Sequence, residues 1–290
     1  MRETLTPKEL AQAIGVSESS LRRWVDAGDI QMQRTVGGHR RIPLAEGLRF
    51  IRQRRATLVR PDIVGLTDVG ADISDNDWVH RGLYDALIRG DRNAARDLIL
   101  SLFIAGRSIP AICDGPLAEA LHRIGDLWLA DRRAILVEHR ATELCAALVR
   151  ELHQGLPAAA ADAPLALGGA AESDPYMIPS LMASLVLADA GLREINFGAN
   201  TPCDLLGYAA AQQHARLVWL SISVELPREM FGKQLIRLAR RLGDLGCHLI
   251  IGGRHAGDIS LAGHANVMYA ASMSELAAFA RGIASTRTAV

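Results

Sequence analysis

The sequence predicts a multidomain protein: a small head of helices and one hairpin, then a small helical bundle, then a doubly wound α/β domain. Three observations predict this order. The N-terminal segment is basic and contains short capped helices. The middle segment places apolar residues three and four apart, and after residue 163 short apolar runs alternate with helical segments. A chain of 290 residues is long enough to build two or three cores.

The first predicted domain, residues 1–60, contains three helices and one hairpin. The helices are expected at residues 6–14, 17–27 and 43–59, with Thr6 and Ser17 as N-caps, and the hairpin around Gly37 and Gly38. This domain holds 12 Lys and Arg against 6 Asp and Glu, whereas the whole chain is neutral. A polyanionic partner is therefore expected to meet the head and not the acidic remainder.

The order helix, turn, helix, hairpin predicts a winged helix-turn-helix that binds double-stranded DNA. The second helix would enter the major groove, and the glycine-rich hairpin would approach the phosphates as a wing. The candidate DNA-binding residues are Ser19, Ser20, Arg22, Arg23, Arg34, His39, Arg40 and Arg41. The alternative interpretation is a solvated charged helix without a DNA partner.

The head resembles the MerR and excisionase families of DNA-binding domains. Their pattern of Arg-Trp, Gly, Arg-Thr and Gly-Gly-His-Arg-Arg is matched over residues 23–41. This resemblance implies sequence-specific binding to duplex DNA on repeated half-sites. It also implies a homo-oligomer.

Residues 61–75 lose their periodicity and predict a linker, and residues 76–155 predict four or five helices in a small bundle. In the bundle, Trp128 precedes Glu138 and His139, and the three could face one cavity. An indole would supply a flat apolar wall, and the other two side chains hydrogen bonds to a polar ligand. The alternative is a core tryptophan beside a surface Glu-His pair.

Residues 164–286 predict a Rossmann-like α/β domain with a five-stranded parallel sheet. The five expected strands lie in the runs LALGGA, LREINFGA, ARLVWLSIS, CHLIIGG and ANVMYA. Ligands of such sheets bind at the carboxyl ends of the strands. The loop AESDPYMIPS, residues 171–180, follows the first strand and is stiffened by Pro175 and Pro179.

The bundle and the α/β domain together resemble the cobalamin-binding module of methionine synthase. Their fusion to a MerR-type head resembles the light-responsive, cobalamin-dependent transcriptional repressors. The resemblance implies that Trp128, Glu138 and His139 cover the upper face of the corrin ring. It further implies ligand contacts at the strand ends, from Asp174, Tyr176, Thr201, Ser221, Ser223, Gly252 and Gly253.

Three positions depart from that family's pattern. Tyr176 stands where a histidine ligates cobalt from below, and Pro179 where a glycine gives room to the nucleotide tail. Leu129 replaces a second histidine of the light-responsive repressors. A phenol with a pKa of about 10 is a poor cobalt donor, although tyrosinate ligates haem iron in some proteins. The metal ligand is therefore unknown, and His255 is either a solvated loop residue or a replacement ligand.

The sequence leaves three interpretations of function. The first is a transcriptional regulator gated by cobalamin, or by haem or a bilin, in a cleft between the bundle and the α/β domain. The second is a regulator whose α/β domain has lost its ligand and serves oligomerisation or partner binding. The third is a corrinoid enzyme or carrier, which the DNA-binding head disfavours, so no catalytic residue is expected.

The sequence also predicts a cytoplasmic protein without a membrane partner. No apolar run reaches ~18 residues, the length of a membrane span, and the N-terminal residues lack a secretory signal. The four cysteines, Cys113, Cys145, Cys203 and Cys247, are scattered and form no Cys-x-x-Cys motif. They are expected to be reduced thiols in the core.

Overall fold

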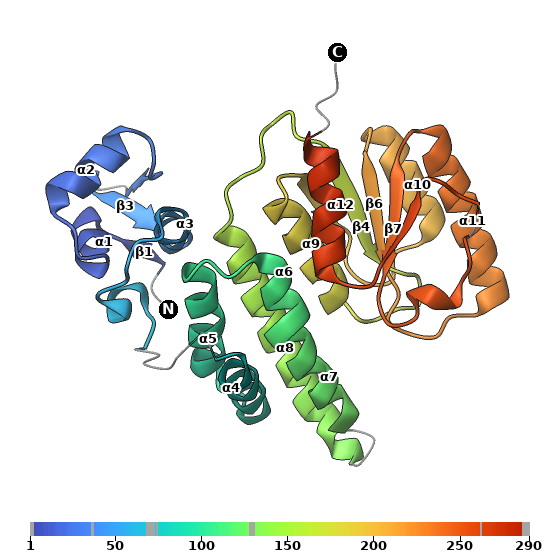
Figure 1. The fold of residues 1–290 in the computed structure, drawn as a ribbon, viewed down its shortest axis with the longest axis horizontal. Helices are drawn as coiled ribbons and strands as arrows, with labels where there is room; N and C mark the ends of the chain where they lie inside the picture. The colour runs from blue at the N-terminus through green and yellow to red at the C-terminus, as the bar shows by residue number, and fades with distance from the viewer. Residues whose placement is uncertain are drawn as a thin grey trace. The chain divides into compact units, whose positions relative to one another are not determined.

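The computed structural model of the chain consists of two compact units (Figure 1). It describes residues 3–35, 38–67, 73, 75–127, 131–261 and 263–285. The first unit contains residues 1–108 and 115–157, and the second contains residues 109–114 and 158–290.

The first unit begins with three helices and three short strands. They are β1 (Thr4–Leu5), α1 (Pro7–Ala13), α2 (Glu18–Asp26), β2 (Gln33–Arg34), β3 (Arg40–Pro43) and α3 (Leu44–Arg54). Strand β3 pairs antiparallel with both β1 and β2, in the order β1-β3-β2. The β2–β3 pair is the predicted hairpin, and Val36 and Gly37 of its turn lie outside the described residues.

The predicted N-caps of α1 and α2 are confirmed. The amide of Glu9 donates to Thr6 Oγ1 at 3.2 Å, and the Glu9 carboxylate accepts from the Thr6 amide at 2.7 Å, which makes a reciprocal capping box. Ser17 Oγ accepts from the amide of Ser20 at 3.1 Å. Gly28 follows α2 with φ +81°, a left-handed conformation that glycine adopts without strain.

The third helix is shorter than the predicted segment 43–59. Helix α3 ends at Arg54 because Arg55 adopts a left-handed backbone with φ 47°. The chain then returns to α1, where the amide of Val59 donates to the carbonyl of Ala13 at 2.7 Å. Apolar residues continue at helical spacing to Val59, so the sequence pattern alone predicted a helix end five residues after Arg54.

The middle segment is helical, as predicted. Four of its helices pack against one another in the first unit: α4 (Asn76–Arg89), α5 (Arg92–Ile104), α7 (Ala118–Asp126) and α8 (Ile135–Gln154). The connecting segments form the short helical turns η1 (Pro61–Val64), α6 (Ile109–Ile112), η2 (Cys113–Leu117) and η4 (Arg132–Ala134). Part of the predicted linker 61–75 is thus structured, because η1 packs on α1 with Ile63 and Val64 buried.

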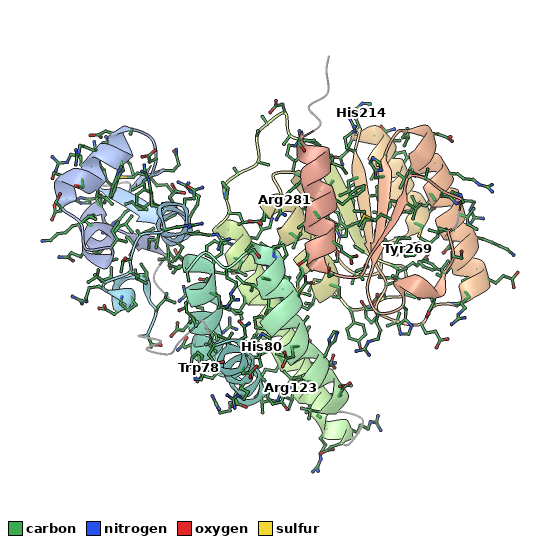
Figure 2. All side chains as sticks on the ribbon, in the orientation of Figure 1. Trp78, His80, Arg123, His214, Tyr269 and Arg281 are labelled. Atoms are coloured by element: carbon green, nitrogen blue, oxygen red, sulfur yellow. The ribbon has the colours of Figure 1, made fainter. Side chains whose placement is uncertain are left out.

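Polar side chains also join these helices. Figure 2 labels His80 of α4 and Arg123 of α7, which both pair with Glu119; the Arg123–Glu119 distance is 3.8 Å. The Arg123 guanidinium lies 3.8 Å from the ring centroid of Tyr84, within cation–π range. Arg96 of α5 is 4% exposed and forms an ion pair at 2.7 Å with Glu151 of α8.

The second unit contains the predicted five-stranded parallel sheet. Its strands are β4 (Leu165–Ala170), β5 (Arg193–Asn196), β6 (Leu217–Ser221), β7 (His248–Gly252) and β8 (Val267–Ala270), in the order β5-β4-β6-β7-β8. All neighbours pair in parallel. In a doubly wound sheet of this order the switch point, where ligands bind, lies between the carboxyl ends of β4 and β6.

Helices cover both faces of this sheet (Figure 1). They are α9 (Ile178–Asp189), α10 (Cys203–Gln212), α11 (Arg228–Asp244) and α12 (Met273–Ser285), with the short turn η5 (Ala256–Asp258). Helices α9 and α12 pack together on one face, and α10 and α11 on the other. The start of α12 is held by Asp114, whose carboxylate accepts the amides of Met273 at 2.7 Å and Ser274 at 2.9 Å. This contact places residues 109–114 with the α/β domain.

All four cysteines are buried free thiols, as predicted. Burial raises the pKa of Cys145, Cys203 and Cys247 to about 12, and that of Cys113 further still. A raised pKa keeps a thiol protonated, and only the thiolate reacts with alkylating agents.

We therefore expect the native protein to resist iodoacetamide at pH 8, and the urea-unfolded protein to be alkylated on all four cysteines. Because the unfolded state releases thiol protons first, stability should also fall as the pH rises from about 9 towards 12. Mass spectrometry of the two samples counts the adducts. Rapid labelling of one cysteine in the native protein would contradict this prediction.

Candidate functional site

The predicted DNA-binding residues lie on the surface of the head. Of the four on α2, Ser19, Arg22 and Arg23 are exposed and Ser20 is half-buried, whereas Leu21 between them is fully buried. On the hairpin, Arg34, His39 and Arg40 are exposed and Arg41 is half-buried. The apolar side of α2 therefore faces the core, and its Ser and Arg residues are left for a partner.

Two arginines face each other across the hairpin. Arg34 of β2 is the register partner of Arg40 of β3. Like charges directly opposite each other in an antiparallel pair destabilise it. Among the described residues neither guanidinium has a carboxylate partner. An arrangement that costs stability and leaves two cations together suits a polyanionic ligand.

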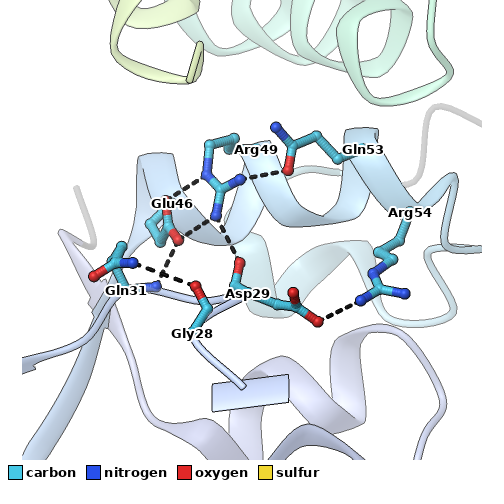
Figure 3. A network of polar contacts seen from close by, with 7 residues as sticks. All are labelled: Gly28, Asp29, Gln31, Glu46, Arg49, Gln53 and Arg54. Atoms are coloured by element: carbon cyan, nitrogen blue, oxygen red, sulfur yellow. Dashed lines mark hydrogen bonds and ion pairs between the residues drawn. The ribbon is translucent and has the colours of Figure 1, made fainter. Parts of the chain in front are cut away.

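Other basic residues of the head are occupied inside the domain (Figure 3). The Arg49 guanidinium binds the Glu46 carboxylate and donates to the carbonyl of Asp29 at 2.8 Å. Glu46 also accepts the amide of Gln31 at 2.7 Å. The hydrogen bond between Arg49 and Glu46 raises the pKa of Arg49. Arg54 forms an ion pair with the Asp29 side chain. This network fixes the segment between α2 and β2 onto α3.

Replacing Glu46 by glutamine should weaken this network by about 1–3 kcal/mol, because one charge-assisted acceptor of a backbone amide is lost. Amide exchange of the segment 28–31 is expected to become faster while exchange in the α/β domain is unchanged. Hydrogen-exchange mass spectrometry makes this measurement. The matched control is Glu18→Gln, an exposed residue of α2, and equal exchange in both variants would refute the prediction.

The bundle residues are described in part. Trp128 and Leu129 lie outside the described residues. Glu138 is half-buried and His139 exposed, both in the first turns of α8. Ile135 and Leu136 just before them are 42% and 71% exposed. Exposed apolar side chains beside a carboxylate and an imidazole suit a ligand with an apolar face and polar groups.

At the carboxyl ends of the strands, Asp174 organises the loops. It is fully buried, and its carboxylate accepts the amides of Tyr176 at 2.9 Å and Ser223 at 2.6 Å. Its carbonyl accepts the amide of Asn200 at 3.1 Å. This residue therefore ties together the loops that follow β4, β5 and β6, and both of its carboxylate oxygens are occupied.

The remaining predicted residues at the strand ends allow neighbouring loops to pack closely. Thr201 is 8% exposed, and a Cβ on Gly169 would lie 2.5 Å from its hydroxyl. Gly253 has φ +104°, and a Cβ there would lie 2.5 Å from the carbonyl oxygen of Ile222, so no larger residue fits. Gly252 is the register partner of Ser221. These residues let the loops approach closely.

Three buried polar atoms at these strand ends have no hydrogen-bond partner among the described residues. They are Ser221 Oγ, Ser223 Oγ and Asn196 Nδ2. Buried polar groups are normally paired, so these three atoms are candidate contacts for a ligand or an ordered water. The sequence predicted the two serines but missed Asn196, whose only signal was a polar residue at the end of an apolar strand.

The same edge also exposes two aromatic rings. Tyr176 follows β4 and Phe197 follows β5, and each is 44% exposed. Exposed rings beside unpaired polar groups are suited to a planar ligand with a polar rim. Here too the sequence predicted only one of the pair, since Phe197 was read as part of a strand.

These residues do not fit cobalamin held through a protein imidazole. At the position that the resemblance assigns to the lower ligand the chain has the phenol of Tyr176. The described residues contain no group of three or more His, Cys, Asp and Glu side chains arranged for a metal ion. The face of the sheet below the strand ends is also filled, because the Trp219 indole lies over Gly168. The lower half of the site therefore departs from that design.

Comparisons with known proteins match two regions of the chain, the head and the bundle. Residues 4–55 match the family model of the helix-turn-helix domain, and residues 79–153 match that of the B12 binding domain. The chain joins a helix-turn-helix domain to a B12-binding domain. No curated protein matches the chain in sequence.

Three solved structures are similar to this one. The monomethylamine corrinoid protein of Methanosarcina barkeri is 19% identical, with a TM-score of 0.52, over 72% of this chain and 99% of that one. The methanol:cobalamin methyltransferase complex of the same organism is 13% identical over 81% and 92%, with a TM-score of 0.37. A cobalamin-binding protein of Desulfitobacterium hafniense is 14% identical over 70% and 97%, with a TM-score of 0.35. The first shows that 72% of this chain shares its fold.

The helices were also compared with the requirements for spanning a membrane. In the described part of the chain, none of them has both the length and the apolar composition that a membrane span requires.

Proposed function

We propose that this protein is a transcriptional regulator that binds duplex DNA through its head and is controlled by a tetrapyrrole in its B12-binding part. Cobalamin is the first candidate ligand, and haem or a bilin the alternative. The observation that carries the proposal is the set of exposed arginines on the head, two of which face each other without a carboxylate partner among the described residues. It is joined to the match of residues 79–153 with the B12 binding domain.

The DNA-binding half rests on which basic residues are available. Arg49 and Arg54 are engaged within the domain, as Figure 3 shows. Arg22 on α2 and the facing pair Arg34 and Arg40 on the hairpin are exposed instead. Helix α2 then acts as the recognition helix and the hairpin as a wing that positions it on the phosphates.

The ligand-binding half rests on two exposed surfaces. In the first unit, Ile135 and Leu136 are exposed beside Glu138 and His139. In the second unit, unpaired polar atoms and exposed rings share the carboxyl ends of the strands. A regulator with one small head makes few base contacts, so we propose that it binds DNA as a homo-oligomer on repeated half-sites.

An absorption spectrum tests the ligand. Protein purified from cells supplied with cobalamin and haem is expected to show discrete visible bands that identify the bound pigment. The same protein, used to select duplexes from a random pool, should enrich one sequence motif in repeated copies. A colourless protein that takes up neither adenosylcobalamin nor haem would overturn the tetrapyrrole half of the proposal.

A second function is favoured by Tyr176 and Pro179 in the positions of the cobalt ligand and the tail glycine. In that case the α/β domain holds no pigment and serves assembly or partner binding. The same spectrum separates the two functions. A colourless protein that still selects a repeated DNA motif as an oligomer supports the second one.

A further inference from the structure

The largest side chain buried near the switch point of the sheet is Trp219 of β6, which is 2% exposed. It shares a face with Ser221 two residues later, because side chains alternate along a strand. Val218 and Leu220 belong to the core on the α10–α11 face. The indole therefore lies on the α9 face of the sheet, directly below the unpaired hydroxyl of Ser221.

The indole occupies a slot made for it by glycine. Gly168 of β4 is the register partner of both Trp219 and Asn196 of β5, so the three lie in one row across the sheet. A Cβ on Gly168 would lie 2.4 Å from ring atom Cδ2 and 2.6 Å from Cγ of the indole. The ring thus lies over the backbone of β4.

The polar end of the ring is recognised specifically. The indole Nε1 donates to Ser180 Oγ of α9 at 3.1 Å, and the Ser180 hydroxyl donates to Asn196 Oδ1, also at 3.1 Å. The amide of Gly198 donates to the same oxygen at 2.8 Å. Ser180 is fully buried, and Asn196 Nδ2 has no partner among the described residues. The indole ring and its N–H group are therefore both held within the α/β domain.

We propose that Trp219 is a built-in occupant of this slot and determines which ligands the α/β domain accepts. Cobalamin carries a nucleotide tail that ends in an aromatic base, and the slot at the switch point already holds an aromatic ring from the chain itself. A ring ligand that binds here keeps any such tail outside the sheet. This inference rests on the proposed tetrapyrrole function. It specifies the ligand class as a planar ring whose affinity does not depend on burying a nucleotide tail.

The ligand experiment compares two probes on the full chain. Adenosylcobinamide has the corrin ring of adenosylcobalamin but no nucleotide tail. The wild-type protein is expected to bind both with dissociation constants within about threefold, because the tail gains no buried contact. Trp219→Ala should prefer adenosylcobalamin by at least about 10-fold, since the emptied slot can bury the aromatic base.

A second measurement does not depend on tetrapyrrole binding. Trp219→Ala should unfold on the order of 10 °C below the wild type, as expected for a large cavity. Millimolar benzimidazole should restore part of that loss. It should leave the wild type and Phe231→Ala unchanged. Phe231 is a matched control because it is also 2% exposed but packs in the core on the opposite face.

Each result decides one point. A wild type that binds adenosylcobalamin at least about 10-fold more tightly than adenosylcobinamide, or no rescue of Trp219→Ala by benzimidazole, overturns the proposal. If the alanine variant does not fold, Trp219→Leu replaces it and the wild-type ratio still decides. If the wild type binds neither probe, the tetrapyrrole function fails, and benzimidazole rescue alone then tests whether the slot accepts a heterocycle.

Discussion

Replacing the facing pair on the hairpin, in the variant Arg34→Ala/Arg40→Ala, is expected to weaken DNA binding roughly 10- to 100-fold at about 150 mM salt. Each arginine that neutralises a phosphate contributes about one unit to the slope of log K against log salt concentration. The slope should therefore fall by about two units. Because phosphates carry no sequence information, all duplexes should lose affinity to a similar extent.

The same variant should not lose stability. Removing two like charges that oppose each other in the β2–β3 pair is worth about 0.2–1 kcal/mol in favour of the folded state. Weaker DNA binding together with an unchanged or higher melting temperature distinguishes a binding surface from a structural defect. The matched control is Arg92→Ala, an exposed arginine at the start of α5.

Fluorescence anisotropy with a labelled duplex, measured at several salt concentrations, gives both the affinity and the slope. If the hairpin variant and the control bind equally well, the hairpin does not contact DNA. In that case Arg22→Ala and Arg23→Ala, on the exposed side of α2, test the recognition helix alone. Removing a side chain that reads a base edge costs about 1–3 kcal/mol of binding free energy and relaxes selectivity at one position.

The second large effect concerns the bundle, residues 79–153, which matches the B12 binding domain. Arg96→Ala is expected to destabilise the chain by about 3–5 kcal/mol, because it leaves the carboxylate of Glu151 without its partner in a partly buried site. The Arg96 side chain is 5% exposed and that of Glu151 25%. Arg96 donates to this carboxylate through Nε at 2.9 Å and Nη2 at 2.7 Å, and through Nη1 to the carbonyl of Gly65 at 2.9 Å.

Replacing both partners separates the two contributions to this loss. In Arg96→Met/Glu151→Leu no charge is left behind, and similar apolar replacements of buried pairs are often neutral. The double variant should thus recover most of the stability, while Arg92→Ala, one turn earlier on α5, should change it by less than about 0.5 kcal/mol. Urea unfolding followed by circular dichroism measures all three. Equal destabilisation by the single and double variants would show that packing, not charge, dominates.

The sequence predicted the elements well where local chemistry decides. Thr6 and Ser17 cap their helices as expected because Ser and Thr hydroxyls at that position accept an amide of the first turn. The five strands were recognised because strands buried in a parallel sheet form short, nearly continuous apolar runs. The end of α3 was missed because a left-handed residue, Arg55, has no signature in apolar spacing.

The sequence predicted the site less completely than the fold. Gly168 and Trp219 are far apart in the sequence, and only the strand register brings them together. From the sequence, Trp219 could therefore be placed only within a predicted strand. Asp174 was predicted to contact a ligand, and its structural role, accepting two amides of neighbouring loops, was not foreseen. Such roles depend on which loops meet at the sheet edge.

The central claim is that ligand binding controls DNA binding. It is tested most directly by measuring the dissociation constant of the full chain for its selected duplex, with and without saturating adenosylcobalamin or haem. Coupling between two sites in one protein typically amounts to about 5- to 150-fold in affinity, so a change of that size is predicted for the pigment that binds. Identical dissociation constants in the presence of a pigment whose absorption bands prove that it is bound would contradict the claim.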